Sequence, residues 1–208
     1  MADRDPLLKP DWVAPARTAL LLIDGQVDFG APEGAMARRG ADIGPAQAAL
    51  ARAVTLTQAA RAAGVAVVFV RLITQPGADT AVTRQARARH EGQPLLCVEG
   101  TPGAEFTGPR PRPGERIVTK TLFSAFHGTG LDTALQAAGI DTLVLAGLTT
   151  ECCVASSAWD AFERDFHVFI AQDACAAYEI GLHQGALRAL QLSGAMLAPA
   201  ADFCIAWK

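Results

Sequence analysis

The chain has 208 residues, half of them hydrophobic, with a formal net charge of -3 and a pI near 5.8. The weak negative charge argues against nucleic-acid or anionic-membrane partners, and no apolar run approaches the roughly 18 residues that a membrane-spanning helix needs. The N-terminus is polar and lacks the apolar core of a secretion signal, so we expect one cytoplasmic domain over residues 1–208.

Apolar runs alternate with helical patterns along the chain. The first run, residues 18–24, ends at an acid and predicts a parallel strand buried on both faces. An Ala-rich segment over 43–63 predicts a helix with its C-cap at Gly64, and residues 65–72 predict a second buried strand. The same alternation continues with strands over 116–120, 140–146 and 166–171, helices over 131–138, 151–164 and 181–193, and a short strand or helix at the C-terminal end.

This alternation predicts an α/β fold with three layers, α/β/α, and a mostly parallel, Rossmann-like sheet of about six strands. Segment 73–115 is rich in Gly, Pro and Arg and is expected to be irregular. A loop of that length is usually functional, as a lid or an oligomer contact. No G-x-G-x-x-G motif follows the first strand, which disfavours a nucleotide-binding module.

Reactive side chains fall where the predicted strands end. Because ligands of parallel sheets bind at the carboxyl ends of the strands, Asp24, Lys120, Asp173 and the turn before Cys153 are expected to converge. A strand, a Gly-rich turn and a helix place Cys153 at a helix N-terminus, where the dipole and backbone N–H groups favour a thiolate and can bind an adjacent oxyanion. This arrangement is what a covalent cysteine hydrolase needs.

The metal-binding residue types are scattered. The five cysteines are odd in number and irregularly spaced, which argues against a disulfide framework, and no C-x-x-C pair suggests a zinc site. The four histidines also lack a metal-ligand spacing and are expected on the surface or in loops. We therefore expect no metal and no cofactor; the histidines are His90, His127, His167 and His183.

Three motifs together resemble the isochorismatase-like cysteine hydrolases. The motifs are Leu-Ile-Asp-Gly-Gln-Val-Asp-Phe over 22–29, Thr-Lys-Thr-Leu-Phe-Ser-Ala-Phe over 119–126 and Gly-Leu-Thr-Thr-Glu-Cys-Cys-Val over 147–154. The resemblance extends from about residue 19 to about residue 190. The family includes nicotinamidase and the N-carbamoylsarcosine, maleamate, biuret and ureidoacrylate amidohydrolases.

The resemblance implies a catalytic triad of Asp24, Lys120 and Cys153. In such a triad the lysine ammonium favours the thiolate, and the aspartate takes the thiol proton and later delivers it to the leaving amine. The resemblance also implies an oxyanion hole formed by the backbone N–H groups of Thr149 and Cys153, with a cis peptide between Leu148 and Thr149. Loss of the amine would leave a thioester, which water then hydrolyses.

Further residues are candidates for substrate contact. Gln26 and Phe29 lie just past the catalytic acid. Phe123 and Phe126 follow the catalytic lysine, and an aromatic residue there is either a pocket wall or a core residue.

Other candidates follow later strands or precede the nucleophile. Arg71 is the one charge at the end of the second strand and could bind a substrate carboxylate; Tyr178 could also reach the site. Glu151 could face the substrate, although capping the helix is the simpler interpretation. The motif places the nucleophile directly before Val, which selects Cys153. Cys152 is about 100° away on a helix, so only one of the two cysteines is expected to face the pocket, and Cys152 is expected to be a packed neighbour.

The sequence departs from the nicotinamidase pattern. Those enzymes carry an Asp-x-His…His metal cluster after the second strand, whereas residues 71–76 contain no histidine. The main hypothesis is a metal-independent hydrolase of a C–N bond in a small linear amide or ureido compound. The alternative is an isochorismatase-type vinyl ether hydrolase in which Asp24 protonates the ether, and a third possibility is a metabolite-binding protein without turnover. Relatives commonly form dimers or tetramers, which implies a homo-oligomer.

Overall fold

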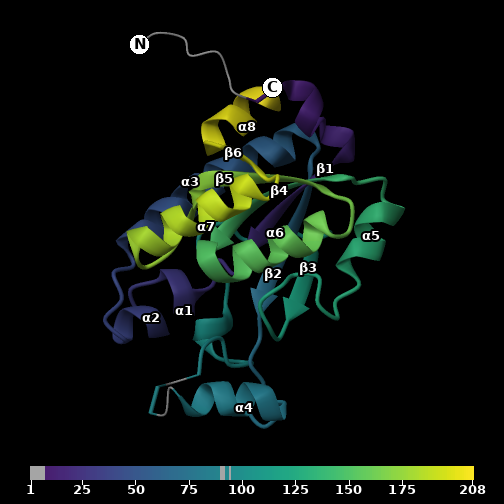
Figure 1. Ribbon diagram of the computed structural model, residues 1–208. Helices are drawn as coiled ribbons and strands as arrows, with labels where there is room; N and C mark the ends of the chain where they lie inside the picture. The colour runs from purple at the N-terminus through teal and green to yellow at the C-terminus, as the bar shows by residue number, and fades with distance from the viewer. Residues whose placement is uncertain (1–7, 90–91, 94) are drawn as a thin grey trace.

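The computed structural model describes residues 8–89, 92–93 and 95–208 and is built around one sheet (Figure 1). Each neighbouring pair of strands runs parallel, in the order β3-β2-β1-β4-β5-β6. Every residue of the two central strands β1 and β4 is buried, as the unbroken apolar runs predict. The strands are β1 (Thr18–Ile23), β2 (Ala66–Leu72), β3 (Arg116–Lys120), β4 (Thr142–Leu148), β5 (His167–Ala176) and β6 (Met196–Ala198).

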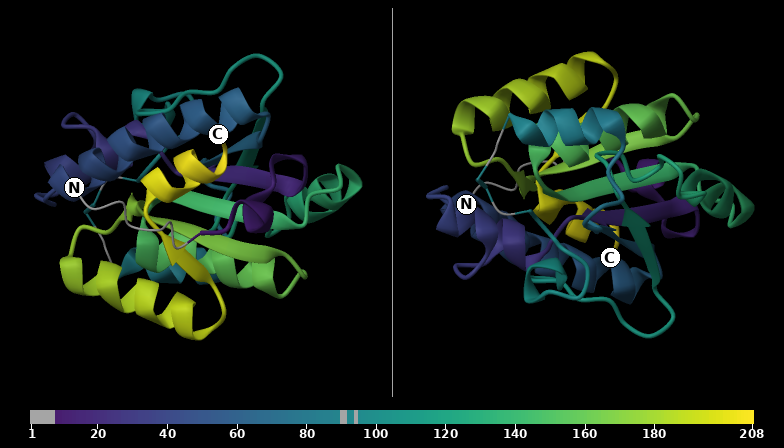
Figure 2. Two further views of the ribbon diagram at one scale, coloured as in Figure 1. Left: turned by 90° about the horizontal axis from the view of Figure 1, so that it is seen from above. Right: turned by 90° about the horizontal axis from the view of Figure 1, so that it is seen from below.

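Helices cover both faces of the sheet (Figure 2). Leu56 of α3 and Phe203 of α8 belong to the core on one face, and Leu135 of α5, Ala158 of α6 and Leu190 of α7 belong to the core on the other. Side chains alternate along a strand, so β1 contributes to both cores. The predicted three-layer α/β/α architecture is therefore confirmed. The helices are α1 (Val27–Gly30), α2 (Ala35–Arg38), α3 (Gly44–Ala63), α4 (Ala81–Ala88), α5 (Leu131–Ala137), α6 (Ala155–Phe162), α7 (Ile180–Leu192) and α8 (Ala200–Ala206).

None of the helices in the described residues has the length and apolar character that crossing a membrane requires. Short helical turns connect the longer elements. The 3₁₀ turns are η1 (Pro10–Val13), η2 (Pro15–Arg17) and η3 (Pro102–Ala104). A single π-helical turn, η4 (Thr150–Val154), leads into α6, so the predicted helix over 151–164 is divided.

Two predicted boundaries change in the structure. Strand β5 continues past residue 171 to Ala176, because the pairing of β4 with β5 shifts register between Leu145 and Gly147 and then resumes. Segment 73–115 is also not wholly irregular, since it contains α4 and η3. None of the α4 side chains that the structure describes is buried, and the apolar Val82 is 75% exposed, so these residues form no buried apolar face that the sequence could have signalled.

The sheet reverses its strand order at β1, which lies between β2 and β4. A crevice forms at such a switch point, beyond the carboxyl ends of the strands. The two strands approach closely there: Gly147 has φ 127°, and a Cβ at this position would lie 1.9 Å from the Ile23 carbonyl oxygen. Asp24 directly follows β1, and it too lies in the left-handed region, with φ 48°.

Asp173 does not join the other strand-end residues, contrary to the sequence prediction. It lies inside the lengthened β5, where one carboxylate oxygen accepts the backbone N–H of Ala200 at 2.7 Å and the other lies 3.3 Å from Arg52. Its carboxylate therefore anchors α8 and α3.

Candidate active site

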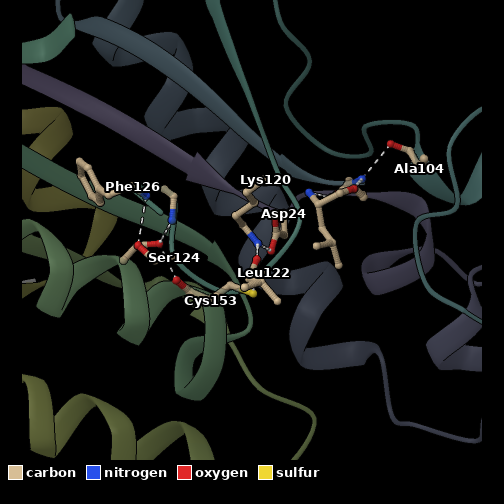
Figure 3. Close-up of polar contacts among 11 residues, drawn as sticks. Asp24, Ala104, Lys120, Leu122, Ser124, Phe126 and Cys153 are labelled. Atoms are coloured by element: carbon tan, nitrogen blue, oxygen red, sulfur yellow. Dashed lines mark hydrogen bonds and ion pairs between the residues drawn. The ribbon is translucent and has the colours of Figure 1, made fainter. Parts of the chain in front are cut away.

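Asp24, Lys120 and Cys153 meet at the carboxyl edge of the sheet, as Figure 3 shows. The Lys120 ammonium donates to the Asp24 carboxylate at 2.7 Å and contacts the Cys153 sulfur at 3.4 Å. It also donates to the Leu122 carbonyl at 3.0 Å. The side chains of Asp24 and Lys120 are both fully buried. One lysine nitrogen thus bridges a carboxylate and a thiol that lie far apart in the sequence.

Charge compensation decides the protonation of this cluster. Burial raises the pKa of Asp24 above its ordinary value, although the Lys120 charge opposes this shift. Burial alone would lower the pKa of Lys120, but the Asp24 charge and the Cys153 sulfur outweigh it and raise that pKa. The contact with Cys152, burial and the Asp24 carboxylate hold the pKa of the Cys153 thiol well above its usual range.

The expected resting thiolate is therefore not what the structure favours. The lysine charge and the helix N-terminus favour a thiolate, but the Asp24 carboxylate, 2.7 Å from the ammonium, neutralises that lysine charge. The neighbouring Cys152 side chain, burial and the Asp24 charge raise the pKa of Cys153 and so favour the protonated thiol.

The turn that carries Cys153 differs from a regular helix start. The Leu148–Thr149 peptide is cis, as the resemblance implied. The Thr149 carbonyl then accepts the N–H groups of Cys152 and Val154, at 3.2 and 3.1 Å. Cys152 is half-buried and lines the same cavity as Cys153, so the expectation that only one cysteine would face the pocket is not met. That expectation assumed 100° between successive residues, whereas this turn is π-helical.

Glu151 lies in the first turn of η4, where the helix dipole stabilises an acidic side chain, as the capping interpretation expects. No side-chain cap hydrogen bond is formed at the start of η4. One oxygen of its carboxylate is buried without a hydrogen-bond partner among the described residues.

The buried Ser157 side chain joins the turn that carries Cys153 to the loop after β3. The Ser157 hydroxyl donates to the Cys153 carbonyl at 2.7 Å and accepts the Ala125 N–H at 2.9 Å. A second bond between the same two segments joins the Ser124 hydroxyl to the Asp160 carboxylate. Because that loop also supplies the carbonyl at residue 122 that holds the lysine, these bonds fix the sulfur relative to the ammonium.

A cavity of about 560 Å³ opens onto the cysteine, a size typical of small-molecule sites. Thr149, Cys152 and Cys153 lie at its lining, whereas the Asp24 and Lys120 side chains lie buried behind the sulfur. Of the predicted substrate contacts, the structure brings Phe29 and Phe123 to the cavity. The remaining walls come from Arg39, residues 72–75 and 78–80, Thr83, Ala86, Gln93, 95–96 and 121–122.

Of the two alternatives for the aromatic residues after Lys120, Phe126 is a core residue and Phe123 is a residue of the pocket wall. It is 3% exposed, and its ring centroid lies 6.0 Å from that of Phe166 in the core. Phe123 is 58% exposed at the mouth of the cavity.

Three predicted substrate contacts lie outside the cavity lining. Gln26 is fully buried, and its amide bonds to backbone groups instead of facing the cavity. The Arg71 guanidinium donates to the Thr119 hydroxyl at 3.0 Å, across the β2–β3 pair. The Tyr178 hydroxyl donates to the Phe29 carbonyl at 2.9 Å, so it braces a cavity residue from behind.

Gln26 joins three segments of the chain. Its side-chain nitrogen donates to the carbonyls of Leu72 and Ala104 at 2.8 and 2.9 Å, and its oxygen accepts the Leu72 N–H at 2.8 Å. Gln26→Ala should lower the free energy of unfolding by about 2–4 kcal/mol, because it leaves buried backbone groups unpaired. Urea unfolding measures this change.

The matched control is Gln75→Ala, which removes the same amide from an exposed side chain. Its effect should stay within about 0.5 kcal/mol. Equal stability of the two variants would contradict the structural role of Gln26.

The part of the chain that the structure describes forms no cluster of metal-binding side chains at this site. Among the described residues, no three His, Cys, Asp or Glu side chains gather in a way that could hold an ion. His183 instead pairs with the Thr150 hydroxyl at 2.8 Å, and His90 lies outside the described residues.

Comparison with known proteins places this geometry in context. The isochorismatase domain matches residues 18–202. The ureidoacrylate amidohydrolase RutB of Methylobacterium radiotolerans is 32% identical over 200 residues, covering 86% of this chain and 76% of that protein.

Solved structures of similar proteins have the same fold as this chain. An isochorismatase family protein from Desulfovibrio vulgaris is 34% identical, with a TM-score of 0.77 over 89% of this chain and 95% of that one. The nicotinamidase/pyrazinamidase PncA of Bacillus subtilis is 32% identical, with a TM-score of 0.74 over 88% and 99% of the two chains.

Proposed function

The chain belongs to the isochorismatase family, and we propose on that basis that Asp24, Lys120 and Cys153 form its catalytic triad. The curated relatives, named as ureidoacrylate amidohydrolases, support a hydrolase acting on a C–N bond of a small amide or ureido compound. The observation that carries the proposal is the Lys120 ammonium, which contacts both the Asp24 carboxylate and the Cys153 sulfur, while Cys153 lines a cavity.

The first half of the reaction forms a thioester. Asp24 takes the proton of the Cys153 thiol, and the sulfur attacks the substrate carbonyl carbon. The Lys120 ammonium, 3.4 Å from the sulfur, stabilises the negative charge as the proton leaves. The protonated Asp24 then gives its proton to the leaving nitrogen as the C–N bond breaks.

The second half releases the acyl group. Asp24, again a carboxylate, takes a proton from water, and the water oxygen attacks the thioester carbon. The sulfur leaves and recovers a proton from Asp24, so the site returns to its starting state. In both halves the backbone N–H groups of Thr149 and Cys153 are proposed to bind the oxyanion.

Location and assembly are also proposals. The five free cysteines suit the reducing cytoplasm. A homo-oligomer, either a dimer or a tetramer, is supported by large apolar side chains on the outer surface of α7, where Ile180 is 70% and Leu192 is 71% exposed.

The proposal is tested by ammonia release from a panel of small amides: maleamate, N-carbamoylsarcosine, biuret, ureidoacrylate and nicotinamide. We expect release from at least one linear amide or ureido compound, in the presence of a metal chelator. Cleavage of isochorismate without release from any amide would favour the vinyl ether hydrolase instead. No measurable hydrolysis of any of these substrates would contradict the proposed function.

A further inference from the structure

Asp28 belongs to the first of the three sequence motifs but has no part in the proposed reaction. Its side chain is almost fully buried, and the residue is 4% exposed. One carboxylate oxygen accepts the Ala35 N–H at 2.9 Å, and the other accepts the Cys97 N–H at 2.7 Å. The exposed Arg38 adds only a long contact of 3.8 Å to the first oxygen. One buried carboxylate therefore joins two segments that lie far apart in the sequence.

Both of these segments carry walls of the cavity. Ala35 begins α2, and the C-cap of that helix, Arg39, lies at the cavity lining. Residues 95–96, directly before Cys97, lie at the lining too, and so does Phe29, which directly follows the buried carboxylate in the sequence. The carboxylate itself lies outside the lining that the described residues form. It is therefore placed to hold the walls without contact to a bound substrate.

The segment around Cys97 depends on contacts that fix its backbone. Cys97 is fully buried and lies in the left-handed region, with φ 50°, which residues other than glycine seldom adopt. Its carbonyl accepts the Thr74 N–H at 2.9 Å, and the Thr74 carbonyl accepts the Glu99 N–H at 3.0 Å. A strained backbone persists only where its surroundings hold it. The bond from Cys97 to Asp28 is thus one of the contacts that keep residues 95–96 at the cavity.

We propose that Asp28 is a positioning residue, which sets the affinity for the substrate by holding two walls of the cavity together. This inference rests on the proposed function, because it assigns a further role within the same site.

The reacting groups are held by other contacts. The Lys120 ammonium is bound by Asp24 and by the Leu122 carbonyl, and the Cys153 carbonyl accepts the Ser157 hydroxyl. None of these bonds comes from the two segments that Asp28 joins. A displaced wall should therefore weaken ground-state and transition-state binding alike, which raises KM and leaves kcat nearly unchanged.

Asp28→Asn is the first test of this role. The substitution keeps the shape of the side chain, but an amide has one accepting oxygen, and its NH₂ group would face the other backbone N–H. One of the two bonds is therefore lost. KM for the best panel substrate should rise about 10-fold, while kcat stays within about threefold. Steady-state ammonia release measures both constants.

Gly103→Ala displaces the same carboxylate without changing its charge. A Cβ at residue 103 would overlap both carboxylate oxygens of Asp28, so the short aspartate side chain has to move away from its two N–H donors. KM should rise as in Asp28→Asn, again with little change in kcat. Two unrelated substitutions that give the same split between KM and kcat would assign the effect to the carboxylate.

Asp173→Asn is the matched control. It also alters a carboxylate that accepts a backbone N–H, from Ala200 at 2.7 Å, but this bond holds α8 and lies outside the cavity lining. The control should lower stability and leave KM unchanged. Hydrogen exchange adds a measurement that needs no turnover, because the N–H groups of Ala35 and Cys97 should exchange faster in Asp28→Asn and Gly103→Ala.

The outcomes separate this inference from the proposed function. Hydrolysis by the wild type with an unchanged KM in Asp28→Asn and Gly103→Ala would overturn the role of Asp28 and leave the function standing. A fall in kcat at constant KM, or an equal rise of KM in Asp173→Asn, would also overturn the role. If the wild type hydrolyses no panel compound, the proposed function falls. Hydrogen exchange then decides the role of Asp28: faster exchange at Cys97 supports it, and unchanged exchange overturns it.

Discussion

Replacing Cys153 by alanine is expected to lower amide hydrolysis by at least about 1,000-fold while leaving the fold intact. The substitution removes the sulfur that would form the thioester. The side chain is 7% exposed but small, so its loss should cost about 1 kcal/mol of stability. Ammonia release and urea unfolding on the same preparations measure both effects.

Cys152 provides the matched control for this substitution. It is the neighbouring thiol and lines the same cavity, but it lacks the contact with the Lys120 ammonium that Cys153 makes. Cys152→Ala should therefore retain activity within about tenfold of the wild type, a change of about 1.4 kcal/mol in the barrier. A reversed order of the two variants would assign the nucleophile to Cys152.

Replacing Lys120 by methionine should abolish activity and lower the free energy of unfolding by about 3–5 kcal/mol, because it leaves the Asp24 carboxylate buried without a counter-charge. The pKa of Asp24 is already raised by burial, and losing the lysine raises it further. A raised folded-state pKa gives stability that is present at low pH and lost as pH rises. The difference in the free energy of unfolding between the wild type and the variant should therefore become smaller at acidic pH.

A double substitution distinguishes the buried charge from simple loss of packing. Asp24→Asn together with Lys120→Met removes both charges and keeps similar side-chain volumes. The double variant should recover most of the lost stability while remaining inactive. Additive losses of stability in the two single variants, measured by urea unfolding, would contradict the account of the ion pair.

Much of the fold could be predicted because single segments carry the necessary signal. Strand β3 has the predicted bounds, and α3 ends at Gly64, which takes the predicted left-handed conformation with φ 77°. Runs of apolar residues and helix caps are local properties of the chain. The three motifs also placed Asp24, Lys120 and Cys153 together before any geometry was known.

The walls of the site could not be predicted in the same way. A polar side chain such as Gln26 goes where distant partners accept its hydrogen bonds, and those partners lie 46 and 78 residues away. Arg39 lines the cavity from the C-cap of α2, a four-residue helix that the sequence did not signal. Arg71 and Tyr178 were favoured for their positions beside strand ends, but strand ends do not fix where a long side chain points.

The most direct test of the account is mass spectrometry of the wild-type protein, quenched in acid during turnover of the best panel substrate. The account predicts a mass increase by the acyl or carbamoyl group of the substrate, located on Cys153 and lost once the substrate is consumed. Sustained hydrolysis with no adduct on Cys153 at any time, although Cys153→Ala is inactive, would contradict the thioester. An adduct located on Cys152 would contradict the assigned nucleophile.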